Sequence, residues 1–490
     1  MSAFTSNSID TLSPRDRWLA LSGVGLGVLM ATIDSSIVNI SLPTLVTVFQ
    51  TSFAAVQWVV LSYILVITSL ILGVARLGDM FNKKMLYMGG LALFTVGSFL
   101  CAQARDIYVL IGFRALQGLG AVLTQALGMA IVTQIFPSSE RGRALGIVGS
   151  MISIGIAIGP PLGGLIIAFS DWSWIFLVNL PIGVAALTIV YKFVPNLQPV
   201  NPNQRFDFAG AAIMFVTLAC FALALTMAET AGFASPRIIG LLAAALIGLA
   251  LFISIERRLK QPMIDLRLFQ NVLFDMNLAM AFLVFIVLSG LFIIPFYLEL
   301  VLGLDTTLVG LLMMVQPITM AIVAPVAGAL SDKLGPRAIS VVGLVLISLG
   351  ALSIASLQAG QTPLNFAVHI LPMGLGIGMF QSPNNSAIMG AVPRERLGIA
   401  SGLLSLSRTL AQTTGLPVVG ALFTHAVLAF GNYPAAMDVT QAPPPALVSG
   451  IHQTFLLAAF VIGISILIAV AALWLDERRK RAVAMPGDTF

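Results

Sequence analysis

Two charged residues inside long apolar runs carry the clearest chemical signal in this sequence. Asp34 lies in the first run and Arg114 in the fourth. A charged side chain in hydrocarbon costs about 2.5–3.5 kcal/mol on insertion scales, so each should face a cavity or a partner. Each lies about seven residues from the outer end of its run, which places both roughly 10 Å below the outer surface. They could therefore pair. Asp34 then serves either as a proton- or cation-coupling site or as half of a fixed structural ion pair.

Other polar residues share helix faces within the apolar runs. Gln117 and Gln125 follow Arg114 along one side of the fourth run, and Arg408 lies among serines and a glutamine on one face of the thirteenth. For Arg408, a structural role and a substrate role are equally open, and Gln125 could either line a cavity or bond across an interface. The candidate residues of a substrate cavity are Tyr63, Gln125, Phe380, Gln381 and Arg408.

Two further groups could serve conformational change. Glycine and proline permit bending and close backbone approach in the middle of the fifth run, at Gly155, Gly159, Pro160, Gly163 and Gly164. Acids and bases cluster at the inner ends of runs, where such groups can latch neighbouring helices in one state. They are Asp79, Lys83 and Lys84 in the first half, and Asp332, Lys333 and Arg337 in the second.

Composition shows what must position these residues. The chain has 490 residues, 58% of them hydrophobic and 9% charged, and its mean hydropathy is +1.00. Runs near 20 apolar residues predict an all-α integral membrane protein with fourteen transmembrane helices. The outer loop 428–450, with Pro443, Pro444 and Pro445, is expected to be irregular and locally extended. The predicted spans are 18–41, 54–76, 85–103, 107–135, 143–167, 173–192, 208–228, 238–256, 273–301, 307–330, 338–357, 364–391, 397–427 and 451–475.

The basic residues orient these spans. Of the 25 Lys and Arg residues, only Arg105 and Arg237 fall in outer loops, and only Arg114 and Arg408 fall inside spans. All others lie in inner segments, as the positive-inside rule requires when both termini are cytoplasmic. The net charge of +5 therefore reflects topology in the inner (plasma) membrane and indicates no nucleic-acid partner. The polar first 17 residues contain no cleavable signal peptide, so the first span acts as the insertion signal.

An internal repeat divides the chain. A shift of 256 residues places Gln117–Gln125 on Met373–Gln381, and Gly159 on Gly415. Two parallel six-helix halves, 1–194 and 273–490, with a linker and two extra helices in 195–272, fit a transporter with a midplane binding site. Asp34, Arg114 and Arg408 have no charged counterpart in the other half, so they are the best candidates for work that one half does alone.

Several chemistries are not expected. The two cysteines, Cys101 and Cys220, lie in apolar runs, and the three histidines show no ligand spacing, which argues against a metal site. No Walker loop is present, so ATP is not the expected energy source. With no nucleophile–base spacing, we expect no enzyme and no cofactor.

Five stretches resemble motifs of the major facilitator superfamily, in its fourteen-span drug:proton antiporter branch. They are Ile33–Pro43, Arg76–Asp79 with Lys83 and Lys84, Arg114–Gly120, Gly155–Gly164 and Trp172–Gly183. The resemblance implies alternating access, with Asp34 carrying a proton and Arg114 assisting its transfer. Met80 stands where that family's loop motif has a basic residue, which weakens the expected inner latch of the first half.

The sequence thus predicts a multidrug antiporter that uses the proton gradient to export apolar or cationic small molecules across the lipid bilayer. The alternative is a proton-coupled exporter dedicated to one native metabolite or lipid. A third hypothesis is a non-transporting sensor. Such a protein would not need charged residues that lie at the same membrane depth and occur in only one half of the repeat. An outer-membrane or periplasmic adaptor is left open as a partner.

Overall fold

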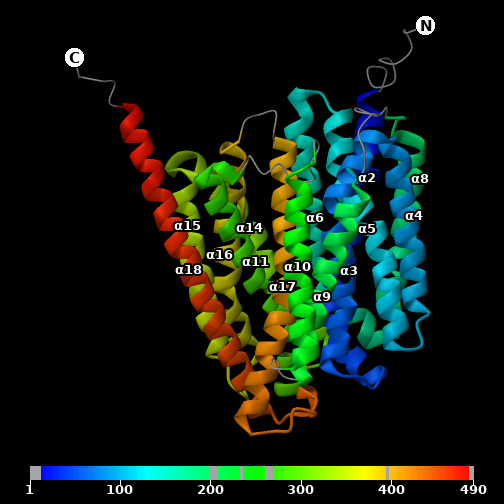
Figure 1. Ribbon diagram of the computed structural model, residues 1–490. Coiled ribbons are helices and arrows are strands. Elements are labelled where there is room, and N and C mark those ends of the chain that lie inside the picture. Colours follow the sequence, from blue (N-terminus) through cyan, green and yellow to red (C-terminus); the bar gives the residue numbers. More distant parts are fainter. Residues whose placement is uncertain (1–12, 198–206, 232–234, 260–268, 393–396, 485–490) are drawn as a thin grey trace. The chain divides into compact units, whose positions relative to one another are not determined.

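The computed structural model describes residues 13–197, 207–231, 235–259, 269–392 and 397–484, and within them every long element is a helix. Fourteen helical stretches of this part of the chain are long and apolar enough to cross a membrane, which confirms the predicted fourteen-span, all-α fold (Figure 1). The inner-segment charges Arg205, Lys260, Arg267, Arg394 and Arg396 lie outside the described residues.

The elements are α2 (Pro14–Val48), α3 (Phe53–Met80), α4 (Lys83–Ala102), α5 (Ile107–Ile135), α6 (Ser138–Phe169), α7 (Trp174–Leu177), α8 (Asn179–Phe193), α9 (Phe208–Ala231), α10 (Pro236–Glu256), α11 (Val272–Ser289), η2 (Gly290–Ile293), α12 (Ile294–Phe296), η3 (Tyr297–Val301), α13 (Thr306–Met313), α14 (Val315–Leu334), α15 (Pro336–Ala355), α16 (Pro363–Gly390), α17 (Leu397–Phe430), η5 (Val439–Gln441) and α18 (Pro444–Ala484).

The chain packs into two compact units. Unit 1 consists of Met1–Met263 with Leu298–Met314, and unit 2 consists of Ile264–Tyr297 with Val315–Phe490. The two extra helices, α9 and α10, belong to unit 1, where α9 packs against α3. The indole of Trp58 on α3 donates a hydrogen bond of 3.2 Å to the Thr226 hydroxyl of α9. The division into 1–194, 195–272 and 273–490 as functional domains stays a prediction.

Side-chain caps and prolines determine several helix starts. Asp106 and Ser52 accept hydrogen bonds from backbone N–H groups in the first turns of α5 and α3, which would otherwise lack acceptors. The expectation of an extended stretch at Pro443–Pro445 is wrong, because α18 begins at Pro444. Proline fits the first turn of a helix, where its missing N–H has no partner to lose.

Helix α6 packs very closely on α2 through the glycines of its motif. A methyl group built at Gly155 would lie 2.9 Å from Thr32 Cβ, and one at Gly163 would lie 2.7 Å from Ile37 Cγ1. Between them, the Ser36 hydroxyl donates a hydrogen bond of 3.1 Å to the Gly155 carbonyl oxygen. Small residues four apart let two helix backbones approach in this way. The motif therefore holds the stretch of α2 that carries Asp34.

The repeat reproduces this packing in unit 2. Gly415 of α17 corresponds to Gly159, and a methyl group there would lie 2.8 Å from the Ile286 carbonyl oxygen of α11. Gly159 and Gly415 thus share an architectural role. In unit 1 the motif also makes a second contact, because a methyl group at Gly164 would overlap the Thr306 carbonyl of α13.

The close approach of α6 and α2 predicts a position-specific cost. In Gly159→Ala the new methyl group would overlap Ser36, whose Cβ lies 2.8 Å away, so we expect a loss of about 1–3 kcal/mol through overpacking. At Gly149 of the same helix, no described atom lies within 4 Å of an added methyl group, so Gly149→Ala is the matched control. Thermal unfolding of the two purified variants tests this, and equal melting temperatures would contradict the packing argument.

Candidate functional site

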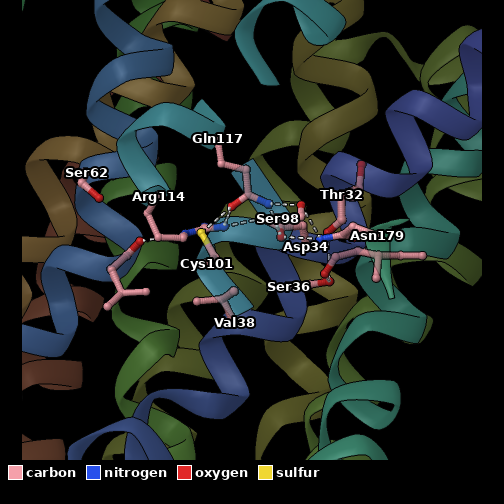
Figure 2. A network of polar contacts seen from close by, with 12 residues as sticks. Thr32, Asp34, Ser36, Val38, Ser62, Ser98, Cys101, Arg114, Gln117 and Asn179 are labelled. Atoms are coloured by element: carbon pink, nitrogen blue, oxygen red, sulfur yellow. Dashed lines mark hydrogen bonds and ion pairs between the residues drawn. The ribbon is translucent and has the colours of Figure 1, made fainter. Parts of the chain in front are cut away.

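The structure brings Asp34 and Arg114 together at the centre of a buried polar network in unit 1 (Figure 2). Asp34 is 0% exposed and Arg114 is 1% exposed. Arg114 Nη1 lies 2.6 Å from Asp34 Oδ2, the distance of a short charge-assisted hydrogen bond. The side chains come from α2 and α5, and Asp34 points toward the amide groups of Gln117 and Asn179 in the same view.

The second carboxylate oxygen of Asp34 is held by two neutral amides. Gln117 Nε2 and Asn179 Nδ2 each donate to Oδ1 at 2.8 Å. The same two amides also donate to the Ser98 hydroxyl of α4, at 2.7 and 3.2 Å. Both oxygens of Asp34 therefore have donors, and helices other than its own supply them. The network therefore ties α2 to α4, α5 and α8 through the carboxylate of Asp34.

Arg114 is fixed independently of Asp34. Its Nε donates to the Val59 carbonyl oxygen of α3 at 3.0 Å, and Nη1 also lies 2.5 Å from Gln117 Oε1. The guanidinium carbon lies 4.3 Å from the centre of the Tyr63 ring and 5.8 Å from that of Phe176, within the range of cation–π attraction. The positive charge is thus surrounded by one carboxylate, two oxygen acceptors and two aromatic faces.

Two polar atoms beside the ion pair have no hydrogen-bond partner in the described part of the chain. They are the Tyr63 hydroxyl and Asn179 Oδ1, both buried. A hydroxyl can donate and an amide oxygen can accept, so the network keeps unused hydrogen-bonding capacity for a small polar group. Within the described residues, no group of three or more His, Cys, Asp or Glu side chains could hold a metal ion.

The remaining candidate cavity residues are dispersed. Gln125 is exposed, Gln381 is half-buried, and Phe380 is buried in unit 2. Arg408 of α17 donates from Nη2 to Asn385 Oδ1 of α16 at 2.7 Å. The Tyr63 ring lies against the Arg114 guanidinium of the ion-pair network. That these residues line a substrate cavity stays a prediction.

The charged clusters at helix ends differ between the units. In unit 1, Lys83 Nζ lies 3.3 Å from Asp79 Oδ1, and Lys84 Nζ donates at 2.8 Å to the Tyr191 carbonyl oxygen of α8. In unit 2, Asp332 and Lys333 are exposed, and Arg337 of α15 forms an ion pair with Asp476 of α18. Arg337 thus contacts an acid of another helix, one that the predicted cluster did not include. Gating by these clusters stays a prediction.

Sequence reasoning missed three residues of these networks. Asn179 lies in the Trp172–Gly183 stretch but stood there without a role, and Ser98 is one small residue among many in its span. Asp476 follows the last predicted span, where it and Glu477 precede a run of basic residues. The only available signal was for Asn179, because a neutral amide inside an apolar span needs a polar partner.

Removing one partner of the ion pair should destabilise unit 1 more than removing both. Arg114→Gln leaves Asp34 as an unpaired buried charge, for which we expect a loss of about 3–5 kcal/mol. The double variant Asp34→Asn with Arg114→Gln leaves no charge at this site. It should therefore recover most of the stability that Arg114→Gln loses. Thermal unfolding of the two variants measures the difference, and a double variant as unstable as Arg114→Gln would contradict the role of charge burial.

Comparison with known proteins agrees with this architecture. The family model described as Major Facilitator Superfamily matches residues 24–416 and 282–488. The riboflavin transporter RibZ of Clostridioides difficile is 34% identical over 414 residues, covering 84% of this chain and 90% of RibZ. The multidrug resistance protein Stp of Mycobacterium tuberculosis is 34% identical over 83% of this chain and 76% of its own. A crystal structure of a POT family transporter in complex with a thioalcohol-conjugated peptide superposes with a TM-score of 0.69 at 12% identity, covering 94% of this chain and 96% of that one. The chain therefore belongs to the Major Facilitator Superfamily of membrane transporters and resembles its drug-efflux branch.

Proposed function

We propose that this transporter exports small, largely apolar organic molecules in exchange for protons, with Asp34 as the group that binds the proton. The observation that carries the proposal is the buried ion pair of Asp34 and Arg114. A carboxylate in the membrane part of a chain is a functional hypothesis by default, because it is costly to keep there. Its partner Arg114 contacts it directly, so a change in the charge of Asp34 is felt at once by the guanidinium.

Protonation of Asp34 would act through Arg114. A neutral Asp34 no longer compensates the guanidinium, which is left as a buried cation beside Gln117 and the Tyr63 ring. Leaving a buried charge uncompensated costs about 3–5 kcal/mol, enough to favour a different arrangement of α2 and α5. A ligand shifts a conformational equilibrium only by binding the two states unequally, and here the proton is that ligand.

The ion pair also affects which chemical class of substrate can bind near Asp34. A cationic compound that binds Asp34 would have to displace Arg114, whose other contacts hold it in place. Substrate and proton would then compete for one group. An apolar compound needs no such displacement, so we place apolar molecules first and keep cations as a testable class.

The relatives support two versions of the proposal. Stp is named for multidrug resistance, which favours broad export, whereas RibZ is named a riboflavin transporter, which favours one dedicated substrate. A dedicated exporter would bind one member of a chemically varied panel far more tightly than the rest. A multidrug exporter would bind many members with similar affinities.

Proton coupling predicts that Asp34→Asn abolishes transport driven by a pH gradient. In inverted membrane vesicles with an acidic interior, wild-type protein should accumulate a fluorescent apolar dye, and collapse of the gradient should release it. Asp34→Asn should lower gradient-driven accumulation to the level of vesicles without the protein, because an amide cannot take up and release the proton as a carboxylate does. Dye binding to the purified variant should persist.

The control is Asp171→Asn, the same change at an exposed acid outside the network, which should transport normally. Gradient-driven accumulation that survives in Asp34→Asn would overturn the coupling role of this residue.

A further inference from the structure

A second membrane-embedded arginine, Arg408, lacks what Arg114 has. Both stand inside spanning helices without a charged counterpart in the other half of the repeat. Arg114 is compensated by a carboxylate at 2.6 Å. Arg408 forms no ion pair with any carboxylate among the described residues of unit 2. One arginine is thus neutralised within the protein, while the other keeps its positive charge.

The surroundings of Arg408 compensate that charge only in part. The Asn385 side chain accepts one hydrogen bond at 2.7 Å through a neutral amide oxygen. The Phe285 ring of α11 lies with its centre 5.2 Å from the guanidinium carbon. An amide dipole and an aromatic face attract a cation but carry no negative charge. They therefore offset only part of the free energy that desolvation of the guanidinium costs.

The guanidinium also has a donor left over. Arg408 Nε is buried and has no hydrogen-bond acceptor among the residues that the structure describes. A guanidinium is a rigid fork whose neighbouring N–H groups match the two oxygens of a carboxylate. Nη2 already donates a hydrogen bond to Asn385. An incoming ligand oxygen would therefore approach the side of the guanidinium that carries the unused Nε–H. The side chain as a whole is half-buried.

Helices of unit 2 hold this arginine in place. Arg408 comes from α17, its amide partner from α16 and its aromatic neighbour from α11, and α17 packs tightly on α11 through Gly415. An arginine fixed by three helices, with one buried donor unused, is preorganised for a ligand. A residue that only reached toward the membrane surface would need no such framework.

We propose that Arg408 binds the negatively charged group of a transported organic anion, with an aromatic monocarboxylate as the simplest case. The carboxylate would accept from Nε–H and one Nη–H, and an aromatic body would lie beside Phe285. The inference rests on the proposed export function, since it takes the ligand to be a transported molecule. It extends the substrate range from apolar compounds to amphipathic anions.

The test compares a carboxylate with its uncharged counterpart at equilibrium, without any pH gradient. The probes are 2-naphthoate and methyl 2-naphthoate, titrated into purified protein in phosphatidylcholine nanodiscs. Wild-type protein should bind the acid about tenfold more tightly than the ester, the difference typical of one charge-assisted hydrogen bond. Arg408→Gln should bind both about equally, and Arg408→Lys should keep a reduced preference because it retains the charge but loses the fork.

Further variants show whether the preference belongs to Arg408. Arg237→Gln, the same change at an exposed arginine, should keep the wild-type preference. If Arg408→Gln does not fold, the comparison of wild type with Arg408→Lys still decides. No preference in wild-type protein, or an unchanged preference in either Arg408 variant, would overturn the proposal. So would loss of the wild-type preference in nanodiscs containing phosphatidylglycerol, which would identify a lipid headgroup as the occupant.

Because the assay uses no gradient, failure of proton coupling at Asp34 would leave its outcome unchanged. The two proposals can therefore fail separately.

Discussion

The ion pair between Asp34 and Arg114 is the constraint on which unit 1 depends. Two opposite charges with exposures of 0% and 1% are costly to bury and become tolerable only when the remaining donors and acceptors find partners. The unit meets that requirement with one side chain or carbonyl from each of several helices: α3 provides the Val59 carbonyl, α4 provides Ser98, and α8 provides Asn179. The glycines of α6 then hold α2 at the required distance. Any change in the charge of Asp34 therefore bears on all these helices at once.

The two half-specific arginines suggest a division of labour between the units. In unit 1 the positive charge is balanced inside the protein, so a proton binding to Asp34 would disturb the balance. In unit 2 the charge of Arg408 meets, among the described residues, an amide and an aromatic ring, so a bound anion would restore the balance. In both proposals, the driving force is the cost of an unpaired charge in a medium of low dielectric constant.

Much of the fold could be predicted because a membrane leaves few choices. Backbone groups in hydrocarbon must bond within a helix, so runs near 20 apolar residues locate the spans directly. The approach of Asp34 to Arg114 followed from their matching depths. The roles of Asn179 and Ser98 could not be predicted, because neutral polar residues are common in spans and only tertiary packing shows which ones meet. The Arg337–Asp476 pair was missed for the same reason, since its members lie on helices far apart in the sequence. The helical start at Pro444 was misjudged because proline suits both extended segments and first turns.

The central claim is that Asp34 itself gains and loses the proton. Infrared difference spectroscopy measures this directly, because a protonated carboxylic acid has a C=O stretching band separate from that of a carboxylate. Lowering the pH across purified wild-type protein in nanodiscs should produce a protonated-carboxyl band that Asp34→Asn lacks and that shifts when water is replaced by heavy water. An identical band in wild type and Asp34→Asn, or none in either, would contradict this claim.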